Sequence, residues 1–85
     1  MDGSAIEEEV RDLVRSRAPL ARERADLPAE LRLGAGGLGL DSISLAELLL
    51  DCQRRFDIPA PIELLEGAPL TVGRLVAHVR AAVGS

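Results

Sequence analysis

The sequence predicts an all-α domain: a small bundle of three main helices and a short fourth helix, with a long loop between the first two. Apolar residues recur at helical spacing in three separate segments. Hydrophobic residues make up 47% of the chain but aromatic residues only 1%, and strands favour aromatic side chains. Proline and glycine separate the periodic segments. We expect residues 1–85 to form one domain, with an ordered core of about residues 5–83.

The first predicted helix covers residues 5–17 and ends before Pro19, because proline disfavours helical backbone at the residue that precedes it. Ser4 and Glu7 have the spacing of a capping box, in which each side chain binds a free amide of the first turn. The apolar stripe of this helix consists of Ile6, Val10, Leu13 and Val14.

Residues 18–40 form the predicted long connection, and a loop of this length is often functional. Residues 26–28 are expected to open a single helical turn. The glycines at 34, 36 and 37 match neither a P-loop nor a dinucleotide-binding fingerprint, since lysine and a preceding strand are missing, so we expect them to supply flexibility. Six leucines are expected to attach the loop to the core: Leu20, Leu27, Leu31, Leu33, Leu38 and Leu40.

The second predicted helix runs from about residue 42 to residue 55, with Asp41 as its N-cap. Its core face repeats at helical spacing and consists of Leu45, Leu48, Leu49, Cys52 and Phe56. Pro59 and Pro61 then interrupt regular structure, and residues 62–65 suit one short helical turn. The last helix is predicted from an N-cap at Thr71 to about residue 83, with a buried stripe of Val72, Leu75, Val76, Val79 and Val83.

Charge and cysteine content exclude several function classes. The net charge of −4 and the pI of about 4.9 argue against nucleic acid, which needs clustered basic residues. Cys52 is the one cysteine, so no internal disulfide or two-cysteine zinc site is possible, and we expect a buried structural thiol. His78 is expected at a core boundary and not on a metal. The acidic start and short apolar runs predict no signal peptide and no membrane span, hence a soluble cytoplasmic protein.

The candidate site is Asp41 and Ser42 at the start of the second helix. A helix N-terminus carries free amides and partial positive charge, so it tolerates an attached phosphate. The glycine-containing loop before it leaves Ser42 accessible to a modifying enzyme. His78 is the one histidine and no G-x-S-x-G elbow is present, so nothing in the sequence activates the serine as a catalytic nucleophile. We therefore expect no catalytic residues, and a partner enzyme must supply the base.

The string LGLDSISLAEL at residues 38–48 resembles the attachment motif of acyl and peptidyl carrier proteins. In that motif a Gly-Leu-Asp-Ser run precedes a helix that carries an acidic residue five positions after the serine, which Glu47 matches. The strings FDIP at 56–59 and TVGRL at 71–75 resemble the end of this helix and the start of the last helix in the family. The resemblance extends from Ile6 to Val83.

The resemblance implies a mechanism and partners. A phosphopantetheinyl transferase, with Mg²⁺ in its own site, transfers 4'-phosphopantetheine from coenzyme A to Ser42. The terminal thiol of this arm then holds acyl or aminoacyl groups as thioesters. The further partners are an acyl-loading enzyme and downstream synthase or transferase enzymes. We expect a monomer, and Met1 with no linker-like end suggests an independent chain.

A second face of this helix is expected to bind partner enzymes, and it consists of Ile43, Ala46, Glu47, Leu50 and Arg54. Ile43 and Leu50 are apolar without a place in the core stripe, so they form a candidate docking patch, with Glu47 and Asp51 meeting arginines of the partner. Two alternatives remain open: Leu50 packs under the 18–40 loop or the 57–70 segment, and Ile43 is a half-buried residue of the first turn.

The charge pattern along this helix distinguishes between pathways. Residues 41–53 contain three acidic residues and no basic one, and Arg54 and Arg55 follow. Carriers of fatty-acid synthesis usually continue acidic here, so a carrier of polyketide or nonribosomal-peptide-like biosynthesis is favoured. A non-covalent helical adaptor explains the spare apolar face but not the serine motif. A serine hydrolase lacks both a base and enough chain to build a pocket.

Overall fold

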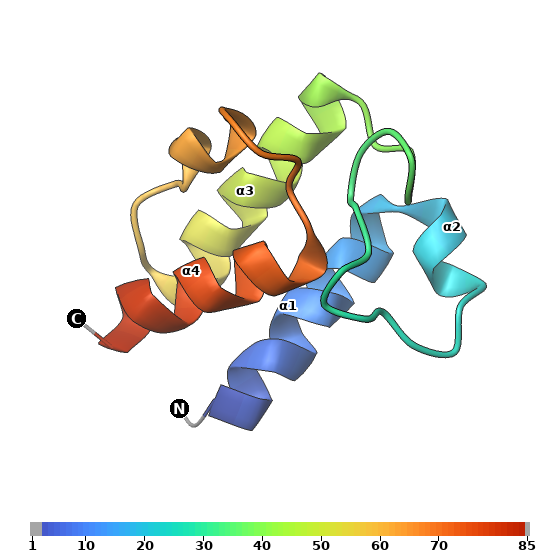
Figure 1. Cartoon of the computed structure of the whole chain (residues 1–85). Helices are drawn as coiled ribbons and strands as arrows, with labels where there is room; N and C mark the ends of the chain where they lie inside the picture. Colours follow the sequence, from blue (N-terminus) through green and yellow to red (C-terminus); the bar gives the residue numbers. More distant parts are fainter. Residues whose placement is uncertain (1–2, 85) are drawn as a thin grey trace.

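The computed structural model describes residues 3–84 (Figure 1). Met1, on which the expectation of an independent chain rests, lies outside the described residues, as do Asp2 and Ser85. The described chain forms helices and no strand, which confirms the all-α fold class. The elements in order are α1 (Gly3–Arg17), α2 (Pro19–Arg22), α3 (Ser42–Phe56), the 3₁₀ helix η1 (Ile62–Leu65) and α4 (Val72–Gly84).

The core lies between the three long helices. α1 contacts both α3 and α4, and η1 packs on α3 (Figure 1). Every residue predicted for the three apolar stripes is buried or partly buried, and no polar or charged residue of the described chain is fully buried. The helical period therefore predicts correctly which face of each helix turns inward. No helix of the described chain has the length and apolar content needed to cross a membrane.

The start of α1 differs from the prediction. The helix begins at Gly3, so the exposed Ser4 lies inside its first turn and is not the N-cap that a capping box requires. The prediction was wrong because the helical backbone continues past the serine, and residue spacing alone does not show where that continuation stops.

The helical turn of the long connection also differs from the prediction. It is α2, which begins at Pro19, and not a turn at residues 26–28, which are irregular. Proline suits the first position of a helix, so Pro19 both ends α1 and begins α2. Arg22 holds this turn against α1 by donating to the carbonyl oxygens of Arg15 and Ser16 at 2.9 and 2.8 Å. This orientation leaves Leu20 52% exposed, so its predicted role in attaching the loop is wrong.

The other leucines of the connection do pack on the core, and four of them are buried: Leu27, Leu33, Leu38 and Leu40. Backbone hydrogen bonds complete the attachment. Residues 29–33 run antiparallel to residues 70–73, with N–H groups of Leu33 and Val72 donating to Leu70 and Leu31 at 3.0 Å. The loop is therefore a fixed structure that leads directly to α3.

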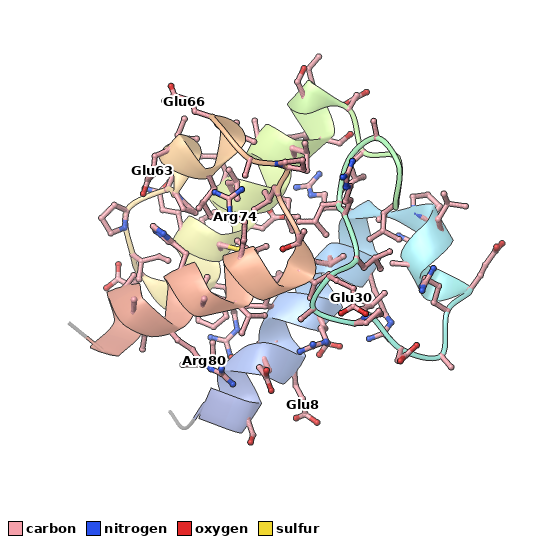
Figure 2. The ribbon with its side chains drawn as sticks, viewed as in Figure 1. Glu8, Glu30, Glu63, Glu66, Arg74 and Arg80 are labelled. Atoms are coloured by element: carbon pink, nitrogen blue, oxygen red, sulfur yellow. The ribbon has the colours of Figure 1, made fainter. Side chains whose placement is uncertain are left out.

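The segment before α4 is held by that helix itself. Arg74 lies in the first turn of α4 (Figure 2). Its guanidinium donates to the carbonyl oxygens of Ala68 and Pro69 at 2.6 and 3.1 Å. Thr71 accepts from the Arg74 N–H at 3.2 Å, which confirms the predicted N-cap. The predicted short turn is η1, and it is confirmed as a 3₁₀ helix.

Candidate functional site

Ser42 is the first residue of α3 and is exposed. Asp41 has extended backbone and caps the helix: its Oδ1 accepts from the Ser44 N–H at 2.7 Å, and its carbonyl accepts from the Leu45 N–H at 2.9 Å. The predicted cap is therefore confirmed. Ser42 itself is exposed to solvent at this helix start.

The charge at this helix start is fixed by backbone geometry. The N–H and hydroxyl of Ser44, followed by the N–H of Ile43, lower the pKa of Asp41 below its ordinary value. Hydrogen bonds to an ionised carboxylate favour that form. Asp41 is therefore a permanent anion at neutral pH that stabilises the first turn beside Ser42.

The other nucleophilic or basic candidates lie elsewhere in the structure. Cys52 is fully buried on the core face of α3, and burial raises the pKa of its thiol to about 12, which confirms the predicted structural thiol. His78 is half-buried on α4 and lies 3.4 Å from the Glu63 carboxylate of η1, in agreement with a boundary position. Among the described residues, no group of acidic, cysteine and histidine side chains is arranged to hold a metal.

The predicted partner face is exposed along α3. Ile43 is 71% exposed, so the alternative that it is a half-buried residue of the first turn is wrong. Leu50 is 39% exposed, so neither the 18–40 loop nor the 57–70 segment covers it fully. Ala46 is half-buried, whereas Glu47 and Arg54 are exposed.

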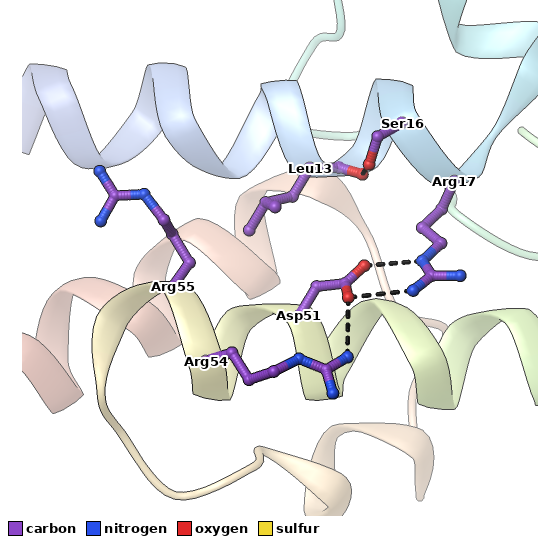
Figure 3. Close-up of a pocket in the computed structure, with 6 residues that line it drawn as sticks. All are labelled: Leu13, Ser16, Arg17, Asp51, Arg54 and Arg55. Atoms are coloured by element: carbon purple, nitrogen blue, oxygen red, sulfur yellow. Dashed lines mark hydrogen bonds and ion pairs between the residues drawn. The ribbon is translucent and has the colours of Figure 1, made fainter.

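Sequence reasoning missed Arg17, the last residue of α1. Its guanidinium donates to both carboxylate oxygens of Asp51, at 2.6 and 3.0 Å (Figure 3). It also donates to Glu47 at 3.1 Å. Arg54 adds a bond to Asp51 at 3.1 Å. Hydrogen bonds from Arg17 hold the pKa of Asp51 below its ordinary value. Arg17 and Asp51 are 34 positions apart in the sequence, and no local spacing signals their pairing.

Two open grooves border α3. One, of about 460 Å³, lies between α1 and α3 and is lined by Leu13, Ser16, Arg17, Asp51, Arg54 and Arg55 (Figure 3). The other, of about 320 Å³, lies between the loop around Gly34, Leu45 of α3 and residues 64–70. Leu45 follows Ser42 by three residues and so shares its side of the helix. An exposed hydroxyl, a helix N-terminus and this second groove fit a phosphate-linked arm on Ser42.

A small helical bundle with an exposed serine at a helix N-terminus is the arrangement that the resemblance to carrier proteins predicts. The sequence pattern described as the phosphopantetheine attachment site matches residues 8–79. The chain is also 34% identical over 76 residues to an acyl carrier protein of Amoebophilus asiaticus (strain 5a2), covering 89% of this chain and 90% of that protein. The search of solved structures gave no significant match.

The chain therefore belongs to the phosphopantetheine attachment family of carrier proteins. This confirms the resemblance found in the sequence and the cofactor that it implied, 4'-phosphopantetheine. At the level of the family, the function is acyl carriage on that cofactor.

Proposed function

We propose that the chain carries acyl or aminoacyl groups as thioesters on 4'-phosphopantetheine attached to Ser42. One observation carries this assignment: within the region that matches the family, Ser42 is an exposed hydroxyl on the first residue of a capped helix. A phosphodiester at that position lies next to the partial positive charge of the helix start.

The attachment reaction requires little of the chain itself. The Ser42 Oγ attacks the phosphorus that bears pantetheine in coenzyme A, an O–P bond forms, and adenosine 3',5'-bisphosphate leaves. The Ser42 proton passes to a base of the phosphopantetheinyl transferase. Asp41 keeps the serine at the helix start through its 2.7 Å bond to the Ser44 amide. The chain itself supplies no catalytic group.

The charge pattern of α3 supports a carrier of polyketide or nonribosomal-peptide-like biosynthesis over one of fatty-acid synthesis. Arg54 and Arg55 lie in the last turn of the helix, and Arg17 pairs with two of its acidic residues. The helix therefore offers less unpaired negative charge than its sequence suggests. The proposed setting is the cytoplasm, where the monomeric chain meets a transferase, a loading enzyme and downstream synthase or transferase enzymes.

Intact-protein mass spectrometry tests the assignment. The chain is incubated with coenzyme A, Mg²⁺ and a broad-specificity phosphopantetheinyl transferase, beside Ser42→Ala and a matched control, Ser44→Ala, which keeps the capping N–H. We expect one phosphopantetheine mass on the original chain and on Ser44→Ala, and none on Ser42→Ala. Absence of any gain on the folded chain with two different transferases favours the non-covalent adaptor.

A second experiment distinguishes the cargo classes. The pantetheinylated chain is offered to a malonyl transferase of polyketide synthesis, to an adenylation enzyme of peptide synthesis and to a fatty-acid malonyl transferase. Loading by either of the first two at a higher kcat/KM than by the third supports the proposed pathway class, and the reverse order contradicts it.

A further inference from the structure

The groove between the loop around Gly34, α3 and residues 64–70 has one charged residue in its lining, Arg32. The other described residues that line this groove are leucine, alanine, glycine and proline, so the lining brings no carboxylate to the Arg32 guanidinium. Arg17 in the other groove is different, because Asp51 lines that groove with it and accepts two of its hydrogen bonds. Arg32 is therefore a cation in an otherwise uncharged groove.

The backbone directs the Arg32 side chain away from the core. Arg32 forms an antiparallel bridge with Thr71, and the N–H of the next residue, Leu33, donates to the Leu70 carbonyl at 3.0 Å. Side chains alternate along extended backbone, and here Leu33 is fully buried whereas Arg32 is exposed. The guanidinium extends over the loop, since a Cβ on Gly36 lies 3.5 Å from Arg32 Nη1. The charge is thus held at the loop wall of the groove.

The opposite wall is fixed by hydrogen bonds of its backbone. Ala68 and Pro69 line the groove, and their carbonyl oxygens accept from the Arg74 guanidinium at 2.6 and 3.1 Å. The acidic residues of this segment, Glu63 and Glu66, do not belong to the lining. Figure 2 shows both of these side chains at the outer edge of η1. Neither carboxylate is therefore placed to neutralise a cation inside the groove.

Leu45 joins the groove to the attachment site. It lines the groove and lies three residues after Ser42, on the same side of α3. Asp41, the acidic residue next to Ser42, is outside the lining and keeps its carboxylate on the Ser44 N–H at 2.7 Å. A group carried on an arm at Ser42 can enter the groove past Leu45, where it meets apolar side chains and the Arg32 guanidinium.

We propose that Arg32 is a specificity-determining residue for the cargo, and that it favours acyl groups that end in a carboxylate over those that end in a methyl group. The apolar lining accommodates the carbon chain of either cargo. Only the carboxylate gains charge-assisted hydrogen bonds from the guanidinium. This inference rests on the proposed role of Ser42 and names the class of cargo that its arm holds in the groove.

The covalent tether makes a weak contact sufficient. An exposed ion pair changes an equilibrium by up to about fivefold, which is too little to retain a free acid. A cargo attached through Ser42 is already present at a high effective concentration, so the same contact decides how often the cargo lies in the groove. We expect a carboxylate-ended cargo to occupy the groove about fivefold more than its methyl-ended counterpart.

Nuclear magnetic resonance of the loaded chain tests this preference. The transferase attaches glutaryl- or pentanoyl-phosphopantetheine to the ¹⁵N-labelled chain, with nitrogen in place of the thioester sulfur so that the cargo stays attached. The two cargoes have equal numbers of carbon atoms and differ in the terminal group. We expect the glutaryl cargo to shift the Nε–H signal of Arg32 and the amides of residues 32–36. The pentanoyl cargo is expected to leave the Arg32 signal where the arm alone puts it.

Variants at Arg32 separate its charge from its place in the loop. Arg32→Gln is expected to remove the difference between the two cargoes at the amides of residues 33–36. Arg32→Lys is expected to restore that difference, because lysine keeps the charge. The matched control is Arg24→Gln, which changes an exposed arginine of the same connection outside the groove lining and keeps the difference.

Three outcomes overturn the proposal, and intact-protein mass spectrometry before each spectrum distinguishes them. A chain that gains no mass contradicts the proposed function of Ser42 and this inference with it. A chain that gains the mass but shows equal Arg32 shifts with both cargoes contradicts the inference alone. An Arg32 shift that appears in full with the arm alone assigns Arg32 to the phosphate of the arm and not to the cargo.

Discussion

Gly37 owes its place to a close backbone approach and not to the flexibility expected of it. A Cβ on this residue meets the Arg32 carbonyl oxygen at 2.0 Å, because Leu38 closes the loop by donating to that same oxygen at 2.9 Å. The neighbouring Gly34 is different, since a Cβ there finds ordinary contacts at 3.5 Å. Alanine substitutions at Gly37 and Gly34 can therefore be compared directly within one loop.

Gly37→Ala is expected to lower the free energy of unfolding by about 1–3 kcal/mol, because backbone atoms of the loop must move to admit the methyl group. Gly34→Ala is expected to stay within about 0.5 kcal/mol of the original chain. Urea unfolding followed by circular dichroism measures both. Equal stability of the two variants contradicts the close approach.

The Arg17–Asp51 pair makes stability depend on pH at the acidic end. The pKa of Asp51 is lowered from 3.8 in the folded chain, chiefly by hydrogen bonds from Arg17, so the unfolded chain binds the proton more readily. The stabilisation is complete above the ordinary pKa and is lost as the pH falls through the lower, folded-state pKa. Asp51→Asn is expected to make the free energy of unfolding depend less on pH in this acidic range.

Unfolding midpoints in urea, measured between about pH 2 and pH 6, test this dependence. The control is Asp57→Asn at the end of α3, because Asp57 is exposed and has left-handed backbone, a conformation that asparagine also tolerates. If Asp51→Asn and Asp57→Asn change the acid slope equally, the specific role of the pair is wrong.

At the scale of elements, α3 has a buried face and an exposed face that contribute differently to stability. Leu49 is fully buried and the adjacent Leu50 is 39% exposed. Leu49→Ala is expected to cost about 2–5 kcal/mol of unfolding free energy, because it leaves a cavity in the core. Leu50→Ala is expected to cost less than about 1 kcal/mol, since much of its side chain already faces water.

Thermal or urea unfolding of the two variants measures the difference in stability. A Leu50→Ala chain that unfolds as easily as Leu49→Ala contradicts the exposed position of Leu50.

The elements that the sequence predicted are those defined by local periodicity. The three long helices, their buried faces, the Asp41 cap and the short turn at residues 62–65 all follow from residues within a few positions of each other. The misplaced turn at 26–28 has a tertiary cause: α2 forms at Pro19 because Arg22 binds back to the end of α1.

The parts that were missed depend on residues that meet across the fold. The backbone pairing of residues 29–33 with 70–73 joins segments about forty positions apart, and the Arg17–Asp51 pair joins two helices. For the candidate site, the helix start was predictable, whereas the charge that α3 presents was not, because it depends on which arginines cover Asp51.

At the scale of the whole molecule, the described residues form one hydrophobic core that includes Cys52. The reactivity of this thiol therefore reports global opening. The side chain is fully buried, and burial raises the pKa of the thiol to about 12 from an ordinary 9.0. The thiolate is the reactive form, so both access and ionisation suppress reaction in the folded chain.

We expect an aromatic disulfide reagent to label Cys52 at neutral pH only through rare opening, at a rate that rises with urea in step with global unfolding. Absorbance of the released thiolate measures this rate. Gly37→Ala supplies an internal check, because a destabilised chain opens more often and labels faster. Labelling of the folded chain at the speed of a free cysteine contradicts a closed core.

The pairing of residues 29–33 with 70–73 also has a consequence for how the protein matures. The segment that leads into Ser42 takes its backbone partners from chain that is synthesised about thirty residues after the serine. The approach to α3 is therefore fixed only after residues 70–73 have been synthesised and have folded back onto the loop.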